Sequence, residues 1–303
     1  MLDPKKQSSV TITHRVEIPE EGAKLKDFLR DVYGISSRLL SKMKKNRQIL
    51  MNGDYAPYHT RVYRGDEIEM HFDEDPNEYP AVSMDLEIAY EDLDLLIINK
   101  KPGVVTHPTR GHHQDTLTNG VVEYFQRIGL KMKVRFVNRL DMNTSGLLIV
   151  AKNPFAHFDL MKQMQEDQVI KHYLTWVRGE VKREQGIIDG KIYNPEHSEG
   201  RRIIDPRGQA SKTGYEVLAT QQNRTLLKVR LYTGRTHQIR VHLASIGHPI
   251  IGDTLYGNGS DDAEGFPRQA LHAYQLEFFQ PRYRRKLQVQ AGMPADMKSL
   301  YET

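Results

Sequence analysis

The stretch NRLDMNTSGLLIVAKN, residues 138–153, decides how the rest of the chain is interpreted. Its first half is polar, whereas Gly146 to Ala151 is a short apolar run typical of a buried strand. Asp141 therefore lies in a polar loop between this strand and an earlier apolar one over 134–137. Hydroxyl side chains and a glycine can close such a loop by backbone hydrogen bonds and a tight return. On chemistry alone, such an aspartate is more often a turn residue than a catalytic one.

The flanking sequence shows helix and strand patterns in alternation. Helices are expected over 24–33, 37–47, 116–128 and 236–246, and one after residue 153. Their predicted caps are Ser37, Asp115 and Asn153. Strands are expected over 49–51, 67–72, 95–99, 134–137, 146–151, 170–178, 211–220 and 225–231. This order predicts an α+β protein with a mixed, mainly antiparallel sheet and flanking helices.

The second expected helix differs from the rest of the chain in its charge pattern. Residues 37–47 read SRLLSKMKKNR and contain no carboxylate. The cations in this stretch are Arg38, Lys42, Lys44, Lys45 and Arg47. With the apolar side chains turned inward they crowd the outer face, which attracts phosphate by charge and counterion release. A solvated surface helix with no partner is the competing interpretation.

This helix belongs to a small α+β unit predicted over residues 15–74. A loose tail is expected at 1–14, an acidic, proline-containing linker at 75–83, and a larger second domain at 84–303. The two short helices and the turns that follow them resemble the small α-L RNA-binding module of a small-subunit ribosomal protein, the S-four-like domain. The resemblance covers roughly residues 22–72 and implies RNA contact through the two helices.

Composition narrows the class of protein. The formal net charge of the 303 residues is only +4, so the clustering of charge is more informative than its total. The absence of cysteine excludes disulfides, thiolate zinc sites and a cysteine nucleophile, and it suits a cytoplasmic protein. The longest apolar runs are too short to cross a bilayer, and no secretion signal is recognisable at the start.

Four stretches together resemble the RluA-type family of pseudouridine synthases. NRLDMNTSGLL is similar to the central family motif H-R-L-D-x-x-T-S-G-L-L, with Asn138 where many members have His. INKKPGVVTHP at 98–108 resembles N-K-P-x-G-x-x-x-H-P, and IKHYLTWVRG at 170–179 resembles K-x-Y-x-A-x-V. Residues 231–257 match the C-terminal motif almost throughout. The resemblance covers about residues 85–290 and implies the pseudouridine synthase fold and the isomerisation of uridine in RNA.

The resemblance also implies a set of site residues. Asp141 takes the place of the catalytic carboxylate, and Tyr173 should stack on the target uracil and move a proton at the base carbon. A carboxylate that stays charged in a closed pocket needs a counter-ion, and an arginine fork is the natural one. Arg240 takes this place by resemblance, with Arg235 as the next candidate. Further contacts with the substrate are expected from Asn138, Arg139, Thr144, Leu243 and His107.

The implied reaction breaks the N-glycosidic bond of a uridine, turns the base and rejoins it through carbon. Nothing is oxidised in the net reaction, so we expect no cofactor and no ATP. We also expect no metal, because His237 and His242 are five residues apart and do not share a helix or strand face. The target base must leave its stack to be reached, so base flipping is expected.

Other classes of protein fit the sequence less well. A non-catalytic RNA-binding protein would have a disabled aspartate or arginine, a zinc deaminase needs cysteine ligands, and a glycosidase needs two cooperating carboxylates. The expected partner is therefore RNA. Large-subunit (23S) ribosomal RNA is preferred because of the appended module, and transfer RNA is the alternative. We expect a cytoplasmic monomer that does not associate with membranes.

Overall fold

The computed structural model describes residues 10–73, 76–109, 111, 114–196, 198, 200–257 and 265–301. In chain order its elements are β1 (Thr11–Arg15), η2 (Ile18–Glu20), α1 (Leu25–Tyr33), α2 (Ser37–Lys45), β2 (Ile49–Met51), β3 (Asp54–Tyr55), β4 (Glu67–His71), β5 (Ile88–Glu91), β6 (Leu95–Lys100), α3 (Leu117–Arg127), β7 (Arg135–Phe136), β8 (Ser145–Ala151), α4 (Pro154–Gln165), β9 (Ile170–Arg178), β10 (Gln185–Asp189), β11 (Ile192–Tyr193), β12 (Ile203–Ile204), β13 (Lys212–Gln221), β14 (Arg224–Leu231), α5 (Gln238–Ser245), β15 (Leu271–Phe279), β16 (Lys286–Gln290), α6 (Ala295–Lys298) and η4 (Ser299–Tyr301). No helix in this described part of the chain is long and apolar enough to span a membrane.

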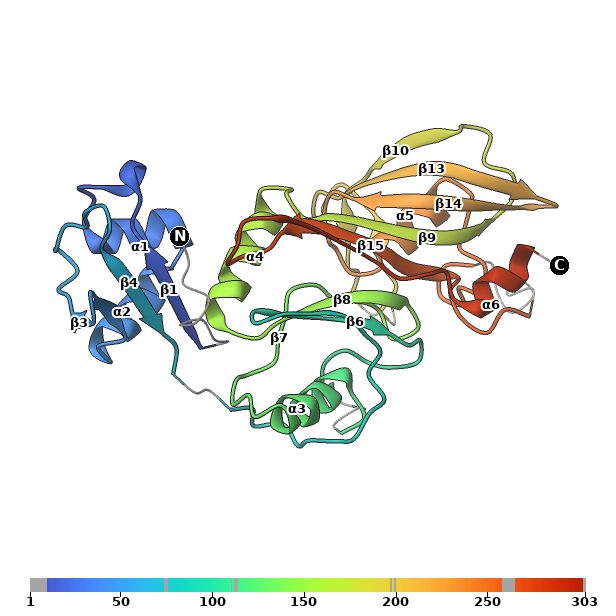
Figure 1. The fold of residues 1–303 in the computed structure, drawn as a ribbon. Coiled ribbons are helices and arrows are strands. Elements are labelled where there is room, and N and C mark those ends of the chain that lie inside the picture. Colours follow the sequence, from blue (N-terminus) through green and yellow to red (C-terminus); the bar gives the residue numbers. More distant parts are fainter. Residues whose placement is uncertain are drawn as a thin grey trace.

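A sheet of ten strands within the described residues forms the body of the molecule (Figure 1). Its main path runs β10-β13-β14-β9-β15-β8-β6-β5, with β16 added to β15 and β7 added to β8. The strand pairs are antiparallel except for β8 and β15, which run parallel. The predicted fold class, α+β with a mixed and mainly antiparallel sheet, is confirmed.

Strand β8 lies at the centre of the fold, and all seven of its residues are buried. Leu148 and Val150 face a core that includes α3, whereas Leu147 and Ile149 face a second core that includes Leu160 of α4. Successive side chains of a strand point to opposite faces of the sheet. Because helices cover both faces at β8, its side chains must be apolar on both faces, which explains the continuous apolar run in the sequence. The loop that carries Asp141 leads directly into β8, so the buried strand fixes the C-terminal end of the loop.

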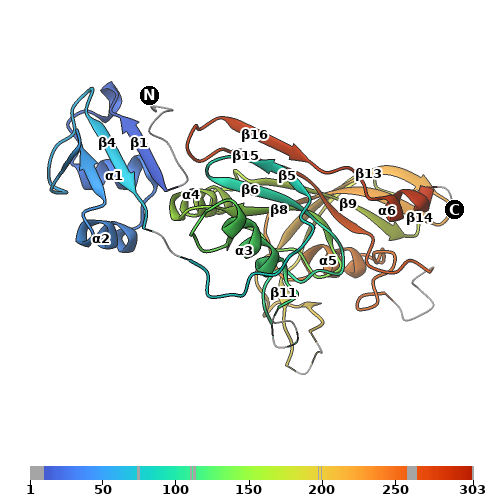
Figure 2. The same cartoon turned by 60° about the horizontal axis from the view of Figure 1, so that its bottom comes forward.

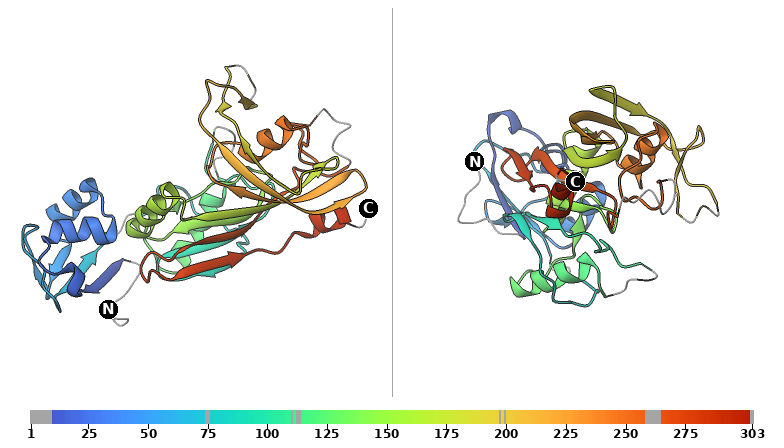
Figure 3. Two further views of the ribbon diagram at one scale, coloured as in Figure 1. Left: turned by 90° about the horizontal axis from the view of Figure 1, so that it is seen from above. Right: turned by 90° about the vertical axis from the view of Figure 1, so that its right-hand side faces the viewer.

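The N-terminal module has its own four-stranded sheet, of order β1-β4-β2-β3, and its own core. Phe155 of α4 joins that core, and its ring meets Tyr33 at 5.4 Å between centroids. Arg282, in the β15–β16 turn, donates a hydrogen bond of 2.8 Å to the Thr11 carbonyl. The module thus packs on α4, at the end of the long axis opposite the C-terminus (Figures 1 and 3).

The expected loose tail at residues 1–14 is wrong for its last part. Residues 1–9 lie outside the described residues, but Thr11–Arg15 is strand β1. Ile12 is fully buried and pairs with Met70 of β4. Burial of this side chain and the antiparallel ladder order a segment whose composition alone indicated a tail.

The expected linker at 75–83 is partly described. Glu74 and Asp75 lie outside the described residues, and residues 76–87 form no helix or strand. The Asn77 carboxamide donates to the Met132 carbonyl at 3.0 Å and accepts from the Val134 amide at 3.2 Å. The Val82 amide donates to the Asn119 carbonyl of α3, and Figure 2 shows the segment running along that helix.

Helix caps were predicted correctly in one case and shifted by one residue in two. Asn153 caps α4 and accepts from the Ala156 amide at 2.8 Å. The cap of α2 is Ser36, not Ser37, because the Ser36 hydroxyl accepts from the Leu39 amide. The cap of α3 is Thr116, not Asp115, because Thr116 forms a reciprocal capping box with Asn119.

Candidate active site

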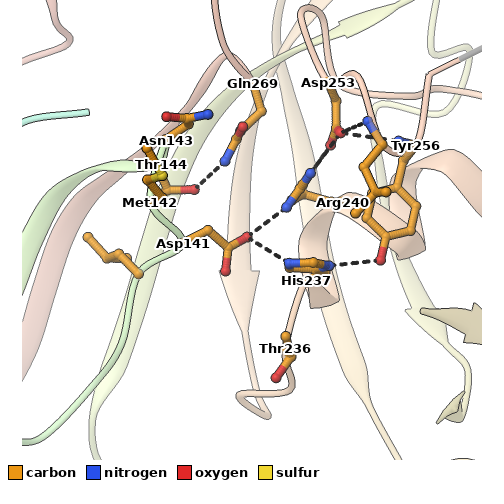
Figure 4. Close-up of polar contacts among 12 residues, drawn as sticks. Asp141, Met142, Asn143, Thr144, Thr236, His237, Arg240, Asp253, Tyr256 and Gln269 are labelled. Carbon is orange, nitrogen blue, oxygen red and sulfur yellow. Dashed lines mark hydrogen bonds and ion pairs between the residues drawn. The ribbon is translucent and has the colours of Figure 1, made fainter. Parts of the chain in front are cut away.

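Asp141 lies in the loop between β7 and β8, and neighbouring segments hold the backbone of that loop. Its carbonyl accepts from the Thr144 amide at 3.0 Å, which closes the turn. The Thr144 hydroxyl in turn accepts from the Gln269 carboxamide at 3.2 Å (Figure 4). Gly146, at φ +110°, follows the turn, and a Cβ there would lie 2.3 Å from the Ala273 carbonyl oxygen. Only glycine allows β8 to begin this close to β15.

A buried lysine fixes the same loop from the other side. Lys100, at the end of β6, is 1% exposed, and its ammonium donates to the carbonyls of Lys101, Val104 and Met142 at 2.8–3.0 Å. Burial lowers the pKa of Lys100 to about 7, and the negative charge of Asp141 opposes that shift. The residue after Asp141 is thus anchored to the motif at 98–108, which lies some forty residues earlier in the chain.

Arg240 of α5 bridges two carboxylates. Its Nη1 donates to Asp141 Oδ2 at 3.1 Å, while Nε and Nη2 form a bidentate pair with Asp253 at 2.7 and 2.9 Å (Figure 4). The Asp253 side chain is fully buried, that of Arg240 is 9% exposed and that of Asp141 is 28% exposed. Asp253 therefore locks the guanidinium from behind, and the Asp141 carboxylate keeps an open side.

The electrostatics of Arg240 follow from this arrangement. Burial alone would lower the pKa of Arg240, but the hydrogen bonds and charges of Asp253 and Asp141 raise it above its ordinary value. Asp253 is placed by Gly252, which adopts φ +74° and would put a Cβ 1.9 Å from the Arg268 carbonyl oxygen. The guanidinium remains cationic at every pH at which the protein is folded.

His237 lies between Asp141 and Tyr256 (Figure 4). Its Nε2 is 3.9 Å from Asp141 Oδ2, and its Nδ1 is 3.0 Å from the Tyr256 hydroxyl. That hydroxyl oxygen accepts from the Arg202 amide at 2.8 Å, so its own proton is available to Nδ1. Burial lowers the pKa of His237 in spite of the Asp141 charge, which makes a neutral imidazole the form at pH 7.

Tyr173 lies on β9 in the same apolar cluster as Leu140 and Leu243. It is 5% exposed and Leu243 is fully buried. Burial, and secondarily the charge of Asp141, raise the pKa of Tyr173, so its hydroxyl stays protonated. The structure thus places Asp141, Tyr173 and Arg240 near one another, as the sequence motifs predicted. Leu243 lies in the apolar cluster that contains Tyr173.

The other residues expected near the substrate have different surroundings. Arg139 is exposed and its Nη2 contacts the Thr236 hydroxyl at 3.3 Å. Arg235 is exposed and donates to the Ala210 carbonyl at 3.4 Å, away from Asp141. His107 is exposed and meets the Phe136 ring edge-on at 4.8 Å. Arg139 precedes Asp141 by two residues, and His107 lies in the matched stretch at 98–108. The counter-ion of Asp141 is Arg240 and not Arg235.

Asn138 and Thr144 hold the loop together. The Asn138 carboxamide accepts from the Ile149 amide at 2.8 Å and donates to the Leu147 carbonyl at 3.4 Å. Thr144 is 2% exposed. Both side chains use their hydrogen-bonding groups within the protein, which favours a role in positioning Asp141 over direct contact with the substrate.

The five cations of the 37–47 stretch lie in the N-terminal module, on an element separate from Asp141. All five residues are exposed: Arg38, Lys42, Lys44, Lys45 and Arg47. Lys42 is 3.9 Å from the Asp73 carboxylate, and the Arg47 guanidinium lies over the Tyr55 ring at 5.3 Å. The predicted cationic face is thus open to solvent, with four of the cations on α2 and Arg47 just after its end.

The sequence interpretation missed several residues of the site. Asp253, His237 and Tyr256 all fall inside the matched stretch at 231–257. A buried arginine in that stretch needs carboxylate partners, which is a signal for a second carboxylate such as Asp253. The spacing of His237 and His242 bears only on a shared metal site and gives no sign that His237 lies beside Asp141. Lys100 lies in the matched stretch at 98–108. Gln269 has no local signal, because only the tertiary structure brings it to the loop.

Comparisons with known proteins agree with this geometry. A family model described as RNA pseudouridylate synthase matches residues 94–245, which include Asp141, Tyr173 and Arg240. A protein of Bacillus subtilis named uncharacterized RNA pseudouridine synthase YjbO is 35% identical over 88% of this chain and 94% of its own length. The ribosomal large subunit pseudouridine synthase D of Nitrosomonas europaea is 38% identical over 80% of this chain and 72% of its own length.

Solved structures show the same similarity. The structure of human RNA pseudouridylate synthase domain containing 1 superposes with a TM-score of 0.58 at 28% identity. It covers 70% of this chain and 85% of the human chain.

Proposed function

This chain belongs to the RNA pseudouridylate synthase family and is a pseudouridine synthase, and from that premise we propose that it modifies large-subunit ribosomal RNA with Asp141 as the catalytic carboxylate. The single observation that carries the role of Asp141 is its contact with Arg240. A partly exposed carboxylate is held at 3.1 Å by a buried guanidinium that Asp253 locks from behind. The preference for ribosomal RNA is supported by the names of the relatives from Nitrosomonas europaea and Pasteurella multocida, both ribosomal large subunit synthases.

The reaction requires an anionic oxygen beside the nucleoside. The bond between N1 of uracil and C1′ of ribose breaks, a bond between C5 and C1′ forms, and the C5 proton is lost while N1 gains one. No atom or electron is gained or lost overall. Attack by the carboxylate on the sugar or base, or its assistance to glycal formation, all use a negative charge at this place. Asp141 supplies that charge from the open side of the pocket.

The neighbouring residues divide the remaining tasks. Arg240 fixes the direction of the Asp141 carboxylate and compensates its charge when RNA displaces water. Tyr173 stacks on the uracil, and Leu243 backs the apolar wall. The raised pKa of Tyr173 keeps its hydroxyl protonated, so in the free enzyme it is a better hydrogen-bond donor than a base.

The RNA must present the target outside its helix. Asp141, in the loop before β8, is 28% exposed, and its partner Arg240 of α5 is buried, so the carboxylate does not project far enough to meet a base that stays stacked in a duplex. The enzyme therefore acts on a flipped uridine. The cationic face of α2 supplies sequence-independent contacts to phosphates that hold the RNA while the base is out.

Site-resolved mapping of pseudouridine tests the substrate. RNA from cells with and without this protein is compared at every uridine of ribosomal and transfer RNA. We expect one or more large-subunit ribosomal positions to lose the modification when the protein is absent. Losses confined to transfer RNA would replace ribosomal RNA by transfer RNA as the substrate. Unchanged maps, together with no release of tritium from 5-tritiated uridine in RNA, would overturn the activity itself.

A further inference from the structure

A cavity of about 490 Å³ lies at the junction of the N-terminal module and the large sheet. Residues of α2, and those that follow β4, line one side, while α4 and β7 line the other. Figure 1 shows α4 beside the module. None of the lining residues belongs to the Asp141 site. The volume falls in the range of about 300–1,000 Å³ that small-molecule sites occupy, which is sufficient for one nucleotide.

Much of the cavity wall is apolar and aromatic. Leu39 and Phe72 come from the module, and Pro154 and Phe158 come from the start of α4. Phe72 is 7% exposed, whereas Phe158 is only half-buried. A partly exposed phenyl ring at a cavity is a platform on which an unstacked base can lie, whatever its identity.

One polar side chain at the cavity, that of Gln48, has no hydrogen-bond partner among the described residues. Gln48 is 7% exposed and lines the cavity. Its backbone is fully used, since the amide donates to the Met43 carbonyl and its carbonyl accepts from His71. In the described part of the chain, its carboxamide makes no hydrogen bond. A carboxamide offers both donors and an acceptor, as the edge of a nucleobase does. A base in the cavity would give this carboxamide hydrogen-bond partners in place of water.

The charges around the cavity favour an anion. Arg38, Lys42 and Arg135 line it together with one carboxylate, Asp73. Lys42 is paired with Asp73 at 3.9 Å, and Arg135 donates to the Lys133 carbonyl at 2.8 Å. In the described part of the chain Arg38 contacts no carboxylate. Among the described lining residues the cations therefore outnumber the carboxylates, which favours a phosphodiester backbone.

Two helices also begin at this cavity. Ser36, the cap of α2, and Pro154, the first residue of α4, both line it. The partial positive charge of a helix N-terminus favours phosphate, and here it adds to the side-chain cations.

A short stretch of chain, β7 and the loop after it, connects the cavity to the Asp141 site. Arg135 lines the cavity, and the chain reaches Asp141 six residues later, a span of at most about 20 Å. Along this path Phe136 contacts His107, and Arg139 is exposed. At this separation, neighbouring parts of one RNA hairpin can reach both places.

We propose that the junction cavity holds a second, unstacked nucleotide of the RNA substrate, distinct from the target uridine. The base stacks on Phe158 and hydrogen-bonds the Gln48 carboxamide, while Arg38 and Arg135 contact the adjoining phosphates. Capture of this nucleotide fixes the register of the RNA, so that a particular uridine reaches Asp141. The inference rests on the proposed function, because it takes the bound RNA to be the substrate of Asp141.

Two cavity variants, one from each wall, and one control on α2 test the proposal. Gln48→Leu and Phe158→Leu remove the carboxamide and the aromatic face without changing charge, whereas Lys45→Gln removes an exposed α2 cation that does not line the cavity. Dissociation constants are measured at several salt concentrations on a ribosomal and a transfer RNA transcript, and KM and kcat on whichever of the two the wild-type protein modifies. Each cavity variant should weaken binding about three- to tenfold with an unchanged salt slope, and KM should rise while kcat stays the same. Lys45→Gln should instead flatten the salt slope.

The proposal is overturned if both cavity variants keep the melting temperature of the wild type and also bind RNA within twofold of it. The two residues come from opposite walls, so a folding defect in one variant leaves the other to decide. The same data separate this proposal from the proposed function. If the wild-type protein releases no tritium from either transcript, the proposed function fails, and the dissociation constants of the variants for these transcripts still test the cavity.

Discussion

The Asp141 site and the outer face of α2 both concentrate charge, but they hold it in opposite ways. At the site, Arg240 is hydrogen-bonded to both Asp141 and Asp253, and the Asp253 side chain is fully buried. On α2 the cations are exposed, and the pair between Lys42 and Asp73 is long, at 3.9 Å, with side chains that are 57% and 41% exposed. A catalytic carboxylate must be held in one orientation relative to the target base. Cations that bind RNA must instead be able to adjust to phosphates in different positions.

The same contrast separates the energetic consequences of mutation. A buried pair that loses one partner leaves an uncompensated charge, which costs about 3–5 kcal/mol. An exposed pair contributes about 0–1 kcal/mol and is screened by salt. Substitutions at the site should therefore change the rate or the stability strongly, and substitutions on α2 should change mainly the salt dependence of RNA binding.

The largest effect is expected from Asp141→Asn. The amide keeps the shape of the side chain but removes the charge, so we predict that tritium release from 5-tritiated uridine in RNA falls at least about a thousandfold. The dissociation constant for the same RNA should stay within about threefold. A variant that loses RNA binding but keeps the turnover of its bound fraction would show that Asp141 contacts RNA without doing chemistry.

Asp253→Asn should have the next largest effect. It leaves Arg240 free to turn away from Asp141, and we predict a drop in kcat of about ten- to a hundredfold and a loss of stability of about 3 kcal/mol. Asp94→Asn is the matched control, since Asp94 forms a fully buried pair with Arg282 far from the site. The control should lower the melting temperature comparably and leave kcat unchanged at temperatures where the protein is folded. Equal losses of kcat in both variants would indicate a general effect of instability.

A smaller, pH-dependent effect is expected at His237. Because burial lowers its pKa below 6.5, the imidazole is neutral at pH 7 and gains a proton only at more acidic pH, which places a new positive charge beside Asp141. We predict that kcat is flat near pH 7 and falls below pH 6.5, and that His237→Gln lowers kcat about three- to tenfold while removing this acidic limb. An identical pH profile in the variant would assign the limb to another group.

The smallest effects are expected on α2. Lys44→Gln and Lys45→Gln should each reduce the slope of log K against log salt by about 0.7–0.9, with kcat and the melting temperature unchanged. Binding measured between low and moderate salt gives this slope directly. A change in kcat at saturating RNA would mean that the cationic face takes part in the chemical step, and the contrast between the two regions would then fail.

The sequence predicts those parts of the fold and of the site whose residues form a pattern over one continuous stretch of chain. Strand β9 was predicted at its observed bounds, and the neighbourhood of Asp141, Tyr173 and Arg240 followed from motifs that continue over many residues. Strand β1 was missed because five residues after a polar start give little periodicity, and it is ordered by pairing with β4.

The contacts of Arg240 and of Thr144 show why the rest was not predicted. Asp253 and Gln269 reach the site only after the chain has passed through a turn that Gly252 makes possible against Arg268. Nothing in the local pattern gives that close approach. The junction cavity is a similar case, because Gln48 and Phe158 are distant in sequence and meet only when α4 packs on the module.

The central claim is that Asp141 performs the chemistry of an RNA pseudouridine synthase, and one measurement in cells tests it most directly. Cells without their own copy of the gene receive either the wild-type protein or Asp141→Asn at equal levels, and pseudouridine is quantified at each site of their ribosomal RNA. We predict that the wild type restores the missing modification fully and that Asp141→Asn restores none. Equal restoration by both proteins would contradict the assignment of Asp141.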